Sequence, residues 1–249
     1  MKIRKILISQ PEPQTEKSPY FDLANKFNLK IDFKPFIHIE GVSVREFRQQ
    51  RINIPDYTAL IFTSRAAVDH FFRICEEMRI TMPDTMKYFC VTESIAFYIQ
   101  KYVVYRKRKI FYGNNNFADL MEYIIKHKEE NFLIPLTDPH KSDMTQVLNK
   151  QNIKSTIGYF YRTVSSDMTQ VNLSDYDIIV FFSPIGIKSL FENFPKFEQK
   201  DLCIGTFGPT TAKAALEAGI RLDIQAPTPE SPSITAALEC FIKKCSKEK

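Results

Sequence analysis

The sequence lacks the long hydrophobic runs that mark membrane and secreted proteins. No stretch approaches the roughly 18 consecutive apolar residues that a membrane span needs. The opening segment MKIRKILISQPEPQ holds only a three-residue apolar run before Ser9 and Gln10, which is unlike the core of a secretory signal. We therefore expect a soluble, cytoplasmic protein with no membrane partner.

Cysteine and histidine are too scattered to indicate a disulfide framework or a metal site. The five cysteines are an odd number without framework spacing, so reduced thiols are expected. The histidines show no ligand spacing, and we expect no metal. Residues 113–116 (GNNN) lack the glycines and the lysine of a phosphate loop and are interpreted as a turn. The residues concerned are Cys75, Cys90, Cys203, Cys240 and Cys245, and His38, His70, His127 and His140.

Positive charge exceeds negative charge only slightly. The chain has 34 basic and 29 acidic residues and a formal net charge of +5, well short of the dense basic stripe that is typical of nucleic-acid-binding proteins. The densest basic run, YRKRK at residues 105–109, is interpreted as a solvated strand edge, although it could receive the anionic groups of a substrate or a nucleic-acid phosphate. We expect no nucleic-acid partner.

Short β-rich runs alternate with amphipathic helical segments along the chain. This alternation predicts an α/β fold with parallel sheets and helices on both faces. The 249 residues, 44% of them hydrophobic, are enough to bury a sizeable core. The expected strands are residues 5–9, 30–36, 59–63, 87–91, 109–112, 132–136, 155–164, 178–182, 202–206 and 222–225. The expected helices are residues 19–27, 65–78, 94–102, 117–128, 144–150, 185–194, 210–218 and 233–243.

An internal similarity decides between one closed barrel and two open sheets. IFTSRAAVDHFF (residues 61–72) resembles VFFSPIGIKSLF (180–191), which gives Ser64 and Ser183 equivalent positions. FCVTESIAFYI (89–99) and TFGPTTAKAAL (206–216) form a second pair. We therefore predict two similar lobes, each an open parallel sheet flanked by helices.

Hydroxyl side chains occur where several expected strands end and the next helices begin. Open parallel sheets bind ligands outside the carboxyl ends of their strands, and hydroxyls beside the free N–H groups of a helix start suit carboxylates or phosphates. Any one of these residues alone is more simply explained as a helix N-cap. The set comprises Thr63, Ser64, Thr92, Ser94, Ser183, Thr206, Thr210 and Thr211.

Six short motifs occur in the order and spacing of a known family. They are SQPEPQ, LIFTSRAAV, YFYRTVS (residues 159–165), VFFSPIGI, IGTFGPTTAKAALEAGI and APTPESPSITAAL. Together they resemble uroporphyrinogen-III synthases over nearly the whole chain, and the FFSP, GPTTA and PTPE elements are fairly specific in combination.

The resemblance implies a cofactor-independent lyase of tetrapyrrole and heme biosynthesis. Its small-molecule substrate is hydroxymethylbilane, which is cyclised through a spiro intermediate to uroporphyrinogen III with inversion of the terminal pyrrole ring. The implied lobes are residues 1–34 with 164–249 and residues 37–160, joined by a two-strand connection that crosses near 35–37 and 161–163. We expect a monomer. The alternative is a non-catalytic two-lobed protein that binds a tetrapyrrole or another polyanion.

The resemblance also implies which residues bind the substrate. Its carboxylate arms would be held by N–H groups at the Gly208 helix start and by the hydroxyls of Thr210 and Thr211. Ser64 and Ser183 would act in the same way at the helices that follow them.

The family's cleft tyrosine is matched by Tyr161, which would donate a proton to the departing hydroxyl. Packing between the lobes is an alternative role for Tyr161, and Tyr159 is a rival for the donor.

The helix start in the second lobe departs from the family pattern. Many members have Gly-x-x-Thr-Ala where this chain has Thr92 and Ile95 at the glycine and threonine positions. Ser94 could substitute from the adjacent position, whereas Glu93 adds a negative charge where carboxylates should bind.

Overall fold

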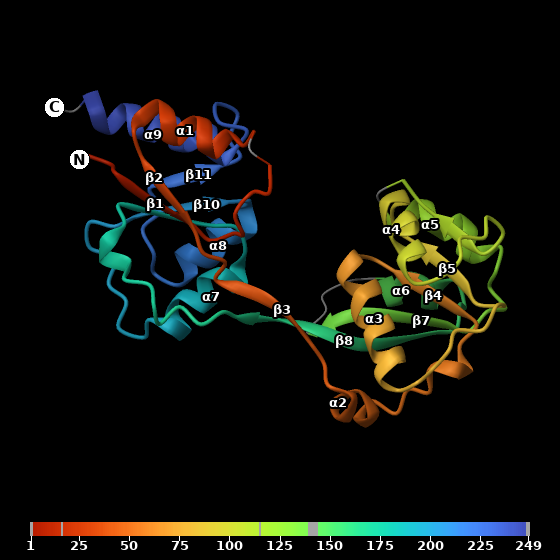
Figure 1. Ribbon diagram of the computed structural model, residues 1–249. Coiled ribbons are helices and arrows are strands. Elements are labelled where there is room, and N and C mark those ends of the chain that lie inside the picture. The colour runs from red at the N-terminus through yellow and green to blue at the C-terminus, as the bar shows by residue number, and fades with distance from the viewer. Residues whose placement is uncertain (1, 16, 115, 139–143, 248–249) are drawn as a thin grey trace. The chain divides into compact units, whose positions relative to one another are not determined.

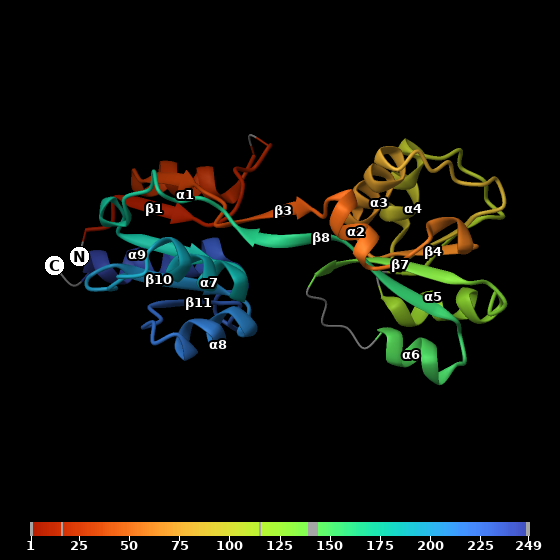
Figure 2. The ribbon, with the colours of Figure 1, turned by 90° about the horizontal axis from the view of Figure 1, so that it is seen from below.

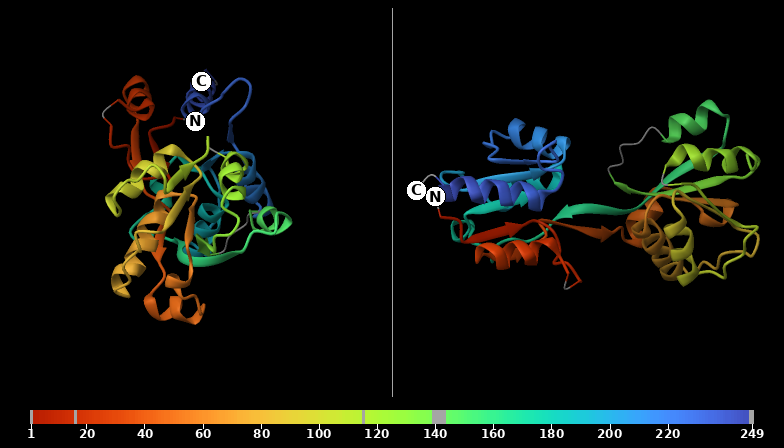
Figure 3. Two further views of the ribbon diagram at one scale, coloured as in Figure 1. Left: turned by 90° about the vertical axis from the view of Figure 1, so that its right-hand side faces the viewer. Right: turned by 90° about the horizontal axis from the view of Figure 1, so that it is seen from above.

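The computed structural model describes residues 2–15, 17–114, 116–138 and 144–247. The chain divides into two compact units. Unit 1 comprises Met1–His38 and Val164–Lys249, and unit 2 comprises Ile39–Thr163. Unit 1 is therefore assembled from both ends of the sequence, and its helices α1 (Pro19–Phe27, red) and α9 (Ile234–Lys247, blue) lie side by side (Figure 3).

Unit 1 is built on a five-stranded sheet of order β11-β10-β9-β1-β2, in which all neighbouring strands are parallel. Helices α1 and α9 cover one face, and α7 and α8 cover the other (Figure 1). The strands are β1 (Lys5–Ile8), β2 (Lys30–Phe33), β9 (Ile178–Phe181), β10 (Cys203–Phe207) and β11 (Ile224–Ala226). The helices are α1 (Pro19–Phe27), α7 (Pro184–Asn193), α8 (Pro209–Glu217) and α9 (Ile234–Lys247).

Local sequence explains why these elements form. Strand β9 is a continuous apolar run, IIVF, and all four residues are buried, as is typical of a parallel strand covered on both faces. Helix α1 begins after Ser18, whose hydroxyl caps it, and has Pro19 in its first turn. It ends at Asn28, which adopts the left-handed conformation.

Unit 2 is built on a six-stranded sheet of order β3-β8-β7-β4-β5-β6. Helices α2, α3 and α4 pack on one face, and α5 and α6 pack on the other (Figure 2). The strands are β3 (Ile37–Gly41), β4 (Ala59–Phe62), β5 (Lys87–Cys90), β6 (Ile110–Tyr112), β7 (Phe132–Asp138) and β8 (Ser155–Ser165). The helices are α2 (Val44–Gln49), α3 (Arg65–Glu77), α4 (Glu93–Tyr98), α5 (Phe117–Ile125) and α6 (Met144–Lys150). Among the described residues, short 3₁₀ helices span Ile54–Asp56 and Ile99–Lys101 in unit 2 and Leu173–Asp175 in unit 1.

The predicted fold class is confirmed, because each unit has an open sheet flanked by helices, in which the strands β11-β10-β9-β1-β2 of unit 1 and β8-β7-β4-β5-β6 of unit 2 are parallel. The closed-barrel alternative is wrong for the described residues. Within those residues no helix is long and apolar enough to cross a membrane.

Two elements, β3 and α2, are absent from the sequence prediction, and several of the expected elements are too long. The sequence predicts a single strand over residues 30–36, whereas β2 ends at Phe33 and a separate strand, β3, begins at Ile37. Helix α2 was also missed, although Ser43 and Glu46 form a capping box there. The expected helix 94–102 ends at Tyr98 and continues as a 3₁₀ turn.

Candidate functional site

In unit 2, Ser64 links a helix start to the long strand β8. It follows β4 in extended conformation, and its Oγ accepts the N–H of Ala67 at 3.0 Å as the N-cap of α3. The same Oγ lies 3.1 Å from the hydroxyl oxygen of Tyr161, a residue of β8. The sequence named both residues but gave no sign of this contact, because they are 97 positions apart.

The Tyr161 side chain is held on two sides. Only 7% of the residue is exposed, and its ring stacks on the ring of His70 with the centroids 5.3 Å apart. Burial raises the pKa of the Tyr161 phenol, and the hydrogen bond with Ser64 opposes part of that rise. The phenol is therefore protonated at neutral pH and fixed in position. His70 was not a candidate in the sequence, where its helix position gave no signal.

The start of α4 is capped by Thr92, one of the hydroxyl residues expected at helix starts. Thr92 is the N-cap, and its Oγ1 accepts the N–H of Ile95 at 3.2 Å. The exposed Ser94 lies in the first turn, with its Oγ 2.9 Å from Thr92 Oγ1. Glu93 accepts a hydrogen bond from the Tyr112 hydroxyl at 3.0 Å.

In unit 1, Ser183 occupies the position that Ser64 has in unit 2. It follows β9, and its Oγ accepts the N–H of Gly186 at 3.0 Å at the start of α7. Both serines are thus N-caps, and their Oγ atoms also face the first turns of their helices. The internal similarity seen in the sequence corresponds to the same strand–cap–helix arrangement in both units.

Helix α8 begins without a side-chain cap. Its N-cap is Gly208, with φ of 91° and ψ of 144°, a conformation that is essentially restricted to glycine. Within the described part of the chain, the N–H groups of Thr210 and Thr211 donate to no protein acceptor. Helix starts with free N–H groups favour anions, and the helix dipole adds to this preference.

The two threonines of α8 differ in exposure. Thr210 is exposed, whereas Thr211 is 1% exposed. Thr210 can therefore offer both its hydroxyl and its N–H to a ligand. Thr211 contributes chiefly its N–H.

Each unit thus gathers its candidate residues at the carboxyl edge of its own sheet. The parallel neighbours β9 and β10 bring Ser183, Gly208, Thr210 and Thr211 to the same edge in unit 1. The parallel neighbours β4 and β5 do the same for Ser64 and Ser94 in unit 2, where Tyr161 contacts Ser64. No group of three or more metal-ligating side chains occurs among the described residues, and His140 lies outside them.

The fold and these edges define a class: a two-unit α/β protein with a hydroxyl-rich and amide-rich sheet edge in each unit. A family model described as "Uroporphyrinogen-III synthase HemD" matches residues 22–236. The chain belongs to the uroporphyrinogen-III synthase family.

Individual relatives agree with this assignment. The chain is 22% identical over 258 aligned positions to the uroporphyrinogen-III synthase of Schizosaccharomyces pombe, covering 97% of this chain and 98% of that protein. The crystal structure of uroporphyrinogen-III synthetase from Helicobacter pylori is similar with a TM-score of 0.60 at 18% identity, covering 97% of this chain and 100% of that one. A mutant uroporphyrinogen III synthase from Thermus thermophilus has a TM-score of 0.51 at 15% identity, with coverages of 99% and 100%. The two structural similarities show the fold.

Proposed function

We propose that the protein cyclises hydroxymethylbilane to uroporphyrinogen III, inverting the terminal pyrrole ring, as a cofactor-independent lyase of heme biosynthesis. The observation that carries this proposal is the family match over residues 22–236, which includes every candidate site residue. We also propose that the protein acts as a cytoplasmic monomer. The non-catalytic alternative is not favoured, because the family match spans most of the chain and the relatives named above are all uroporphyrinogen-III synthases.

The start of α8 supports binding of one carboxylate arm of the substrate. The backbone N–H groups of Thr210 and Thr211 are two free hydrogen-bond donors at this helix start. The exposed hydroxyl of Thr210 is a third donor. Hydrogen bonds to a carboxylate are about twice as strong as those between neutral groups. The Ser183 hydroxyl at the neighbouring helix start would bind a second arm.

In unit 2 the exposed hydroxyl of Ser94 is the proposed contact for an arm, whereas Ser64, the other candidate there, has a single hydroxyl hydrogen, which we assign to the hydrogen bond with Tyr161. Arg65 adds a cation beside Ser64, since it is the first residue of α3 and is exposed. Its guanidinium lies 5.3 Å from the centre of the Tyr98 ring, which orients it at this helix start.

Tyr161 is the proposed proton donor to the hydroxyl that leaves as water. The Ser64 Oγ already accepts the N–H of Ala67, so its own hydrogen can be donated to the Tyr161 oxygen. That arrangement directs the phenolic hydrogen of Tyr161 away from Ser64 and toward a ligand. A proton given up by Tyr161 would then leave a phenolate that Ser64 stabilises.

The remaining chemistry requires little from side chains. Departure of the hydroxyl is driven by the electron-rich pyrrole, and the electrophile formed is attacked at the substituted carbon of the terminal ring. Holding the carboxylate arms at several points brings that carbon close, which is a proximity effect.

A direct assay tests the proposal. Freshly made hydroxymethylbilane is incubated with the protein, and the products are separated into uroporphyrinogen isomers I and III after oxidation. We expect isomer III to dominate, whereas a buffer control closes the ring without inversion to isomer I. Isomer I alone, formed at the rate of the buffer control, would refute the proposed reaction.

A further inference from the structure

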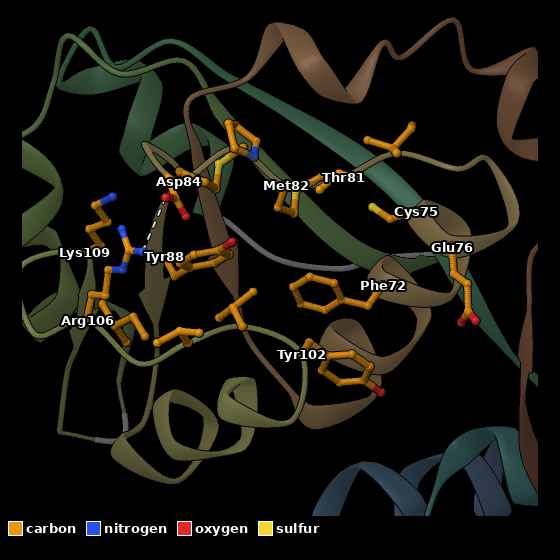
Figure 4. Close-up of a pocket in the computed structure, with 16 residues that line it drawn as sticks. Phe72, Cys75, Glu76, Thr81, Met82, Asp84, Tyr88, Tyr102, Arg106 and Lys109 are labelled. Carbon is orange, nitrogen blue, oxygen red and sulfur yellow. Dashed lines mark hydrogen bonds and ion pairs between the residues drawn. The ribbon is translucent and has the colours of Figure 1, made fainter.

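Unit 2 contains a cavity that the proposed reaction does not use. Its volume is about 400 Å³. It lies between the second half of α3, the segment 80–86, the first residues of β5 and β6, and the segment 102–109 (Figure 4). None of the proposed substrate-binding residues lines it, and Tyr161 does not line it either.

One side of the cavity is apolar and aromatic. The rings of Phe72 and Tyr102 stack in parallel with their centroids 4.5 Å apart, and Met82 and Val103 extend this wall. Small-molecule sites are typically lined by such side chains together with a few polar groups that fix orientation. A flat, apolar ligand body would therefore fit against this wall.

One of the lining tyrosines, Tyr88, presents its hydroxyl to the cavity. Tyr88 is 5% exposed, and its hydroxyl points into the cavity (Figure 4). This hydroxyl makes no hydrogen bond to the part of the chain that the structure describes. The hydroxyl oxygen is open to the cavity, so it can donate a hydrogen bond to a ligand acceptor there.

Positive charge is concentrated at one end of the cavity. Arg106 and Lys109 line that end, and both belong to the basic run that the proposed function leaves unused. The run forms a turn before β6 rather than the strand edge expected from the sequence.

The two cations are not neutralised to the same extent. Arg106 pairs with Asp84 at 3.3 Å, but the Asp84 side chain is 85% exposed, and such pairs contribute little. No described acidic side chain forms an ion pair with Lys109. Glu76 lies at the other end of the cavity (Figure 4).

We infer that this cavity is a binding site for a small organic anion with an aromatic body. The aromatic body packs against Phe72, Tyr102 and Met82, and the anionic group lies at the end formed by Arg106 and Lys109. Tyr88 donates a hydrogen bond to a polar atom of the ligand. The charge at one end selects the orientation of the ligand.

The experiment uses the full-length protein and a matched pair of fluorescent probes. The anionic probe is 8-anilinonaphthalene-1-sulfonate, and the uncharged probe is N-phenyl-1-naphthylamine, which has the same aromatic body without the sulfonate. Titrations compare the unmutated protein with Lys109→Gln and Tyr88→Phe. Lys107→Gln is the control, because Lys107 belongs to the same basic run but does not line the cavity.

We expect saturable binding of the anionic probe at one site. Lys109→Gln should weaken that binding about tenfold, the factor that corresponds to 1.4 kcal/mol, and should leave the uncharged probe nearly unaffected. Tyr88→Phe should weaken binding of the anionic probe several-fold, whereas Lys107→Gln should leave that binding unchanged. Circular dichroism and thermal melting establish that each variant is folded.

Equal affinity of the anionic probe for folded Lys109→Gln and for the unmutated protein would overturn the inference. The inference would also be overturned if Lys107→Gln lost as much affinity for the anionic probe as Lys109→Gln, because that result would indicate general attraction to the basic run. The titrations need no hydroxymethylbilane, so their outcome is independent of the proposed reaction.

Discussion

At the scale of single residues, the environment of Tyr161 defines what this side chain can do. A phenol is a weak acid with a normal pKa of about 10, and burial raises the pKa of Tyr161 further. It therefore stays protonated throughout the neutral range. Its value as a donor depends on being held by Ser64 and His70 rather than on acidity.

Replacing Tyr161 with phenylalanine tests this role. Tyr161→Phe keeps the ring and its stacking on His70 but removes the donor, so formation of isomer III should slow while affinity for uroporphyrinogen III barely changes. A positioned general acid typically contributes about 10²–10⁴-fold, and the readily departing hydroxyl points to a loss at the low end of that range. The measurement is kcat for isomer III together with product affinity.

Tyr159→Phe is the matched control, because this residue is the rival two positions earlier in β8. We expect it to leave kcat unchanged. If kcat fell in Tyr159→Phe but not in Tyr161→Phe, Tyr159 rather than Tyr161 would be the proton donor. Because the Tyr161 pKa is raised, ionisation of this phenol should not reduce activity below about pH 10, its unperturbed value.

At the scale of elements, helices α3, α4, α7 and α8 all begin at the carboxyl edge of a sheet, but their first turns are capped in different ways. Helices α3, α4 and α7 use the hydroxyls of Ser64, Thr92 and Ser183 to satisfy an N–H of their own first turn. Helix α8 leaves its N–H groups free after Gly208. We therefore propose the start of α8, among these four, as the preferred site for an anion.

Two glycine substitutions at opposite ends of α8 separate binding from stability. Gly208 and Gly219 both have positive φ, 91° and 78°, and neither is crowded by neighbouring atoms. Gly208→Ala and Gly219→Ala should each lower the free energy of unfolding by about 1–3 kcal/mol through backbone strain. Only Gly208→Ala should also weaken binding of uroporphyrinogen III, because relief of the strain moves the N–H groups of Thr210 and Thr211.

Urea unfolding measures the first effect, and titration with uroporphyrinogen III measures the second. If both variants bind the product as the unmutated protein does, the α8 start does not hold a carboxylate arm.

At the scale of the whole molecule, unit 1 depends on both ends of the chain. Strand β1 lies between β2 and β9, with Ile6 opposite Ile178. The backbone N–H groups of Arg4 and Lys5 also donate to the Asp177 carboxylate at 2.6 and 2.9 Å. A segment from the start of the sequence therefore completes a sheet whose other central strands come from the last third.

Cutting the chain between Phe36 and His38 tests the proposed domains, residues 1–34 with 164–249 and residues 37–160. We expect the two fragments to co-purify, because β1 stays paired with β9 and the buried Phe36 ring packs on Phe181 with centroids 5.1 Å apart. The measurement is co-elution in size-exclusion chromatography with a tag on one fragment only. A fragment of residues 1–160 that folds independently over its whole length would contradict the proposed arrangement.

The sequence by itself determined the α/β class, most strands and helices, and the caps at Ser64 and Ser183. These features depend on local periodicity and on hydroxyls next to helix starts, which a short window of sequence contains. The family motifs were also visible there, because they are short and ordered.

Only the tertiary structure decided which distant residues meet. The contact of Tyr161 with Ser64, its stacking on His70 and the cavity that joins Phe72 to Lys109 depend on the order of strands in the sheet and on helix packing. The same holds for the free N–H groups of α8, since a glycine in the sequence does not reveal its φ. Local sequence preferences determine where helices and strands form. Which of these elements contact one another depends on the burial of apolar surface over the whole chain.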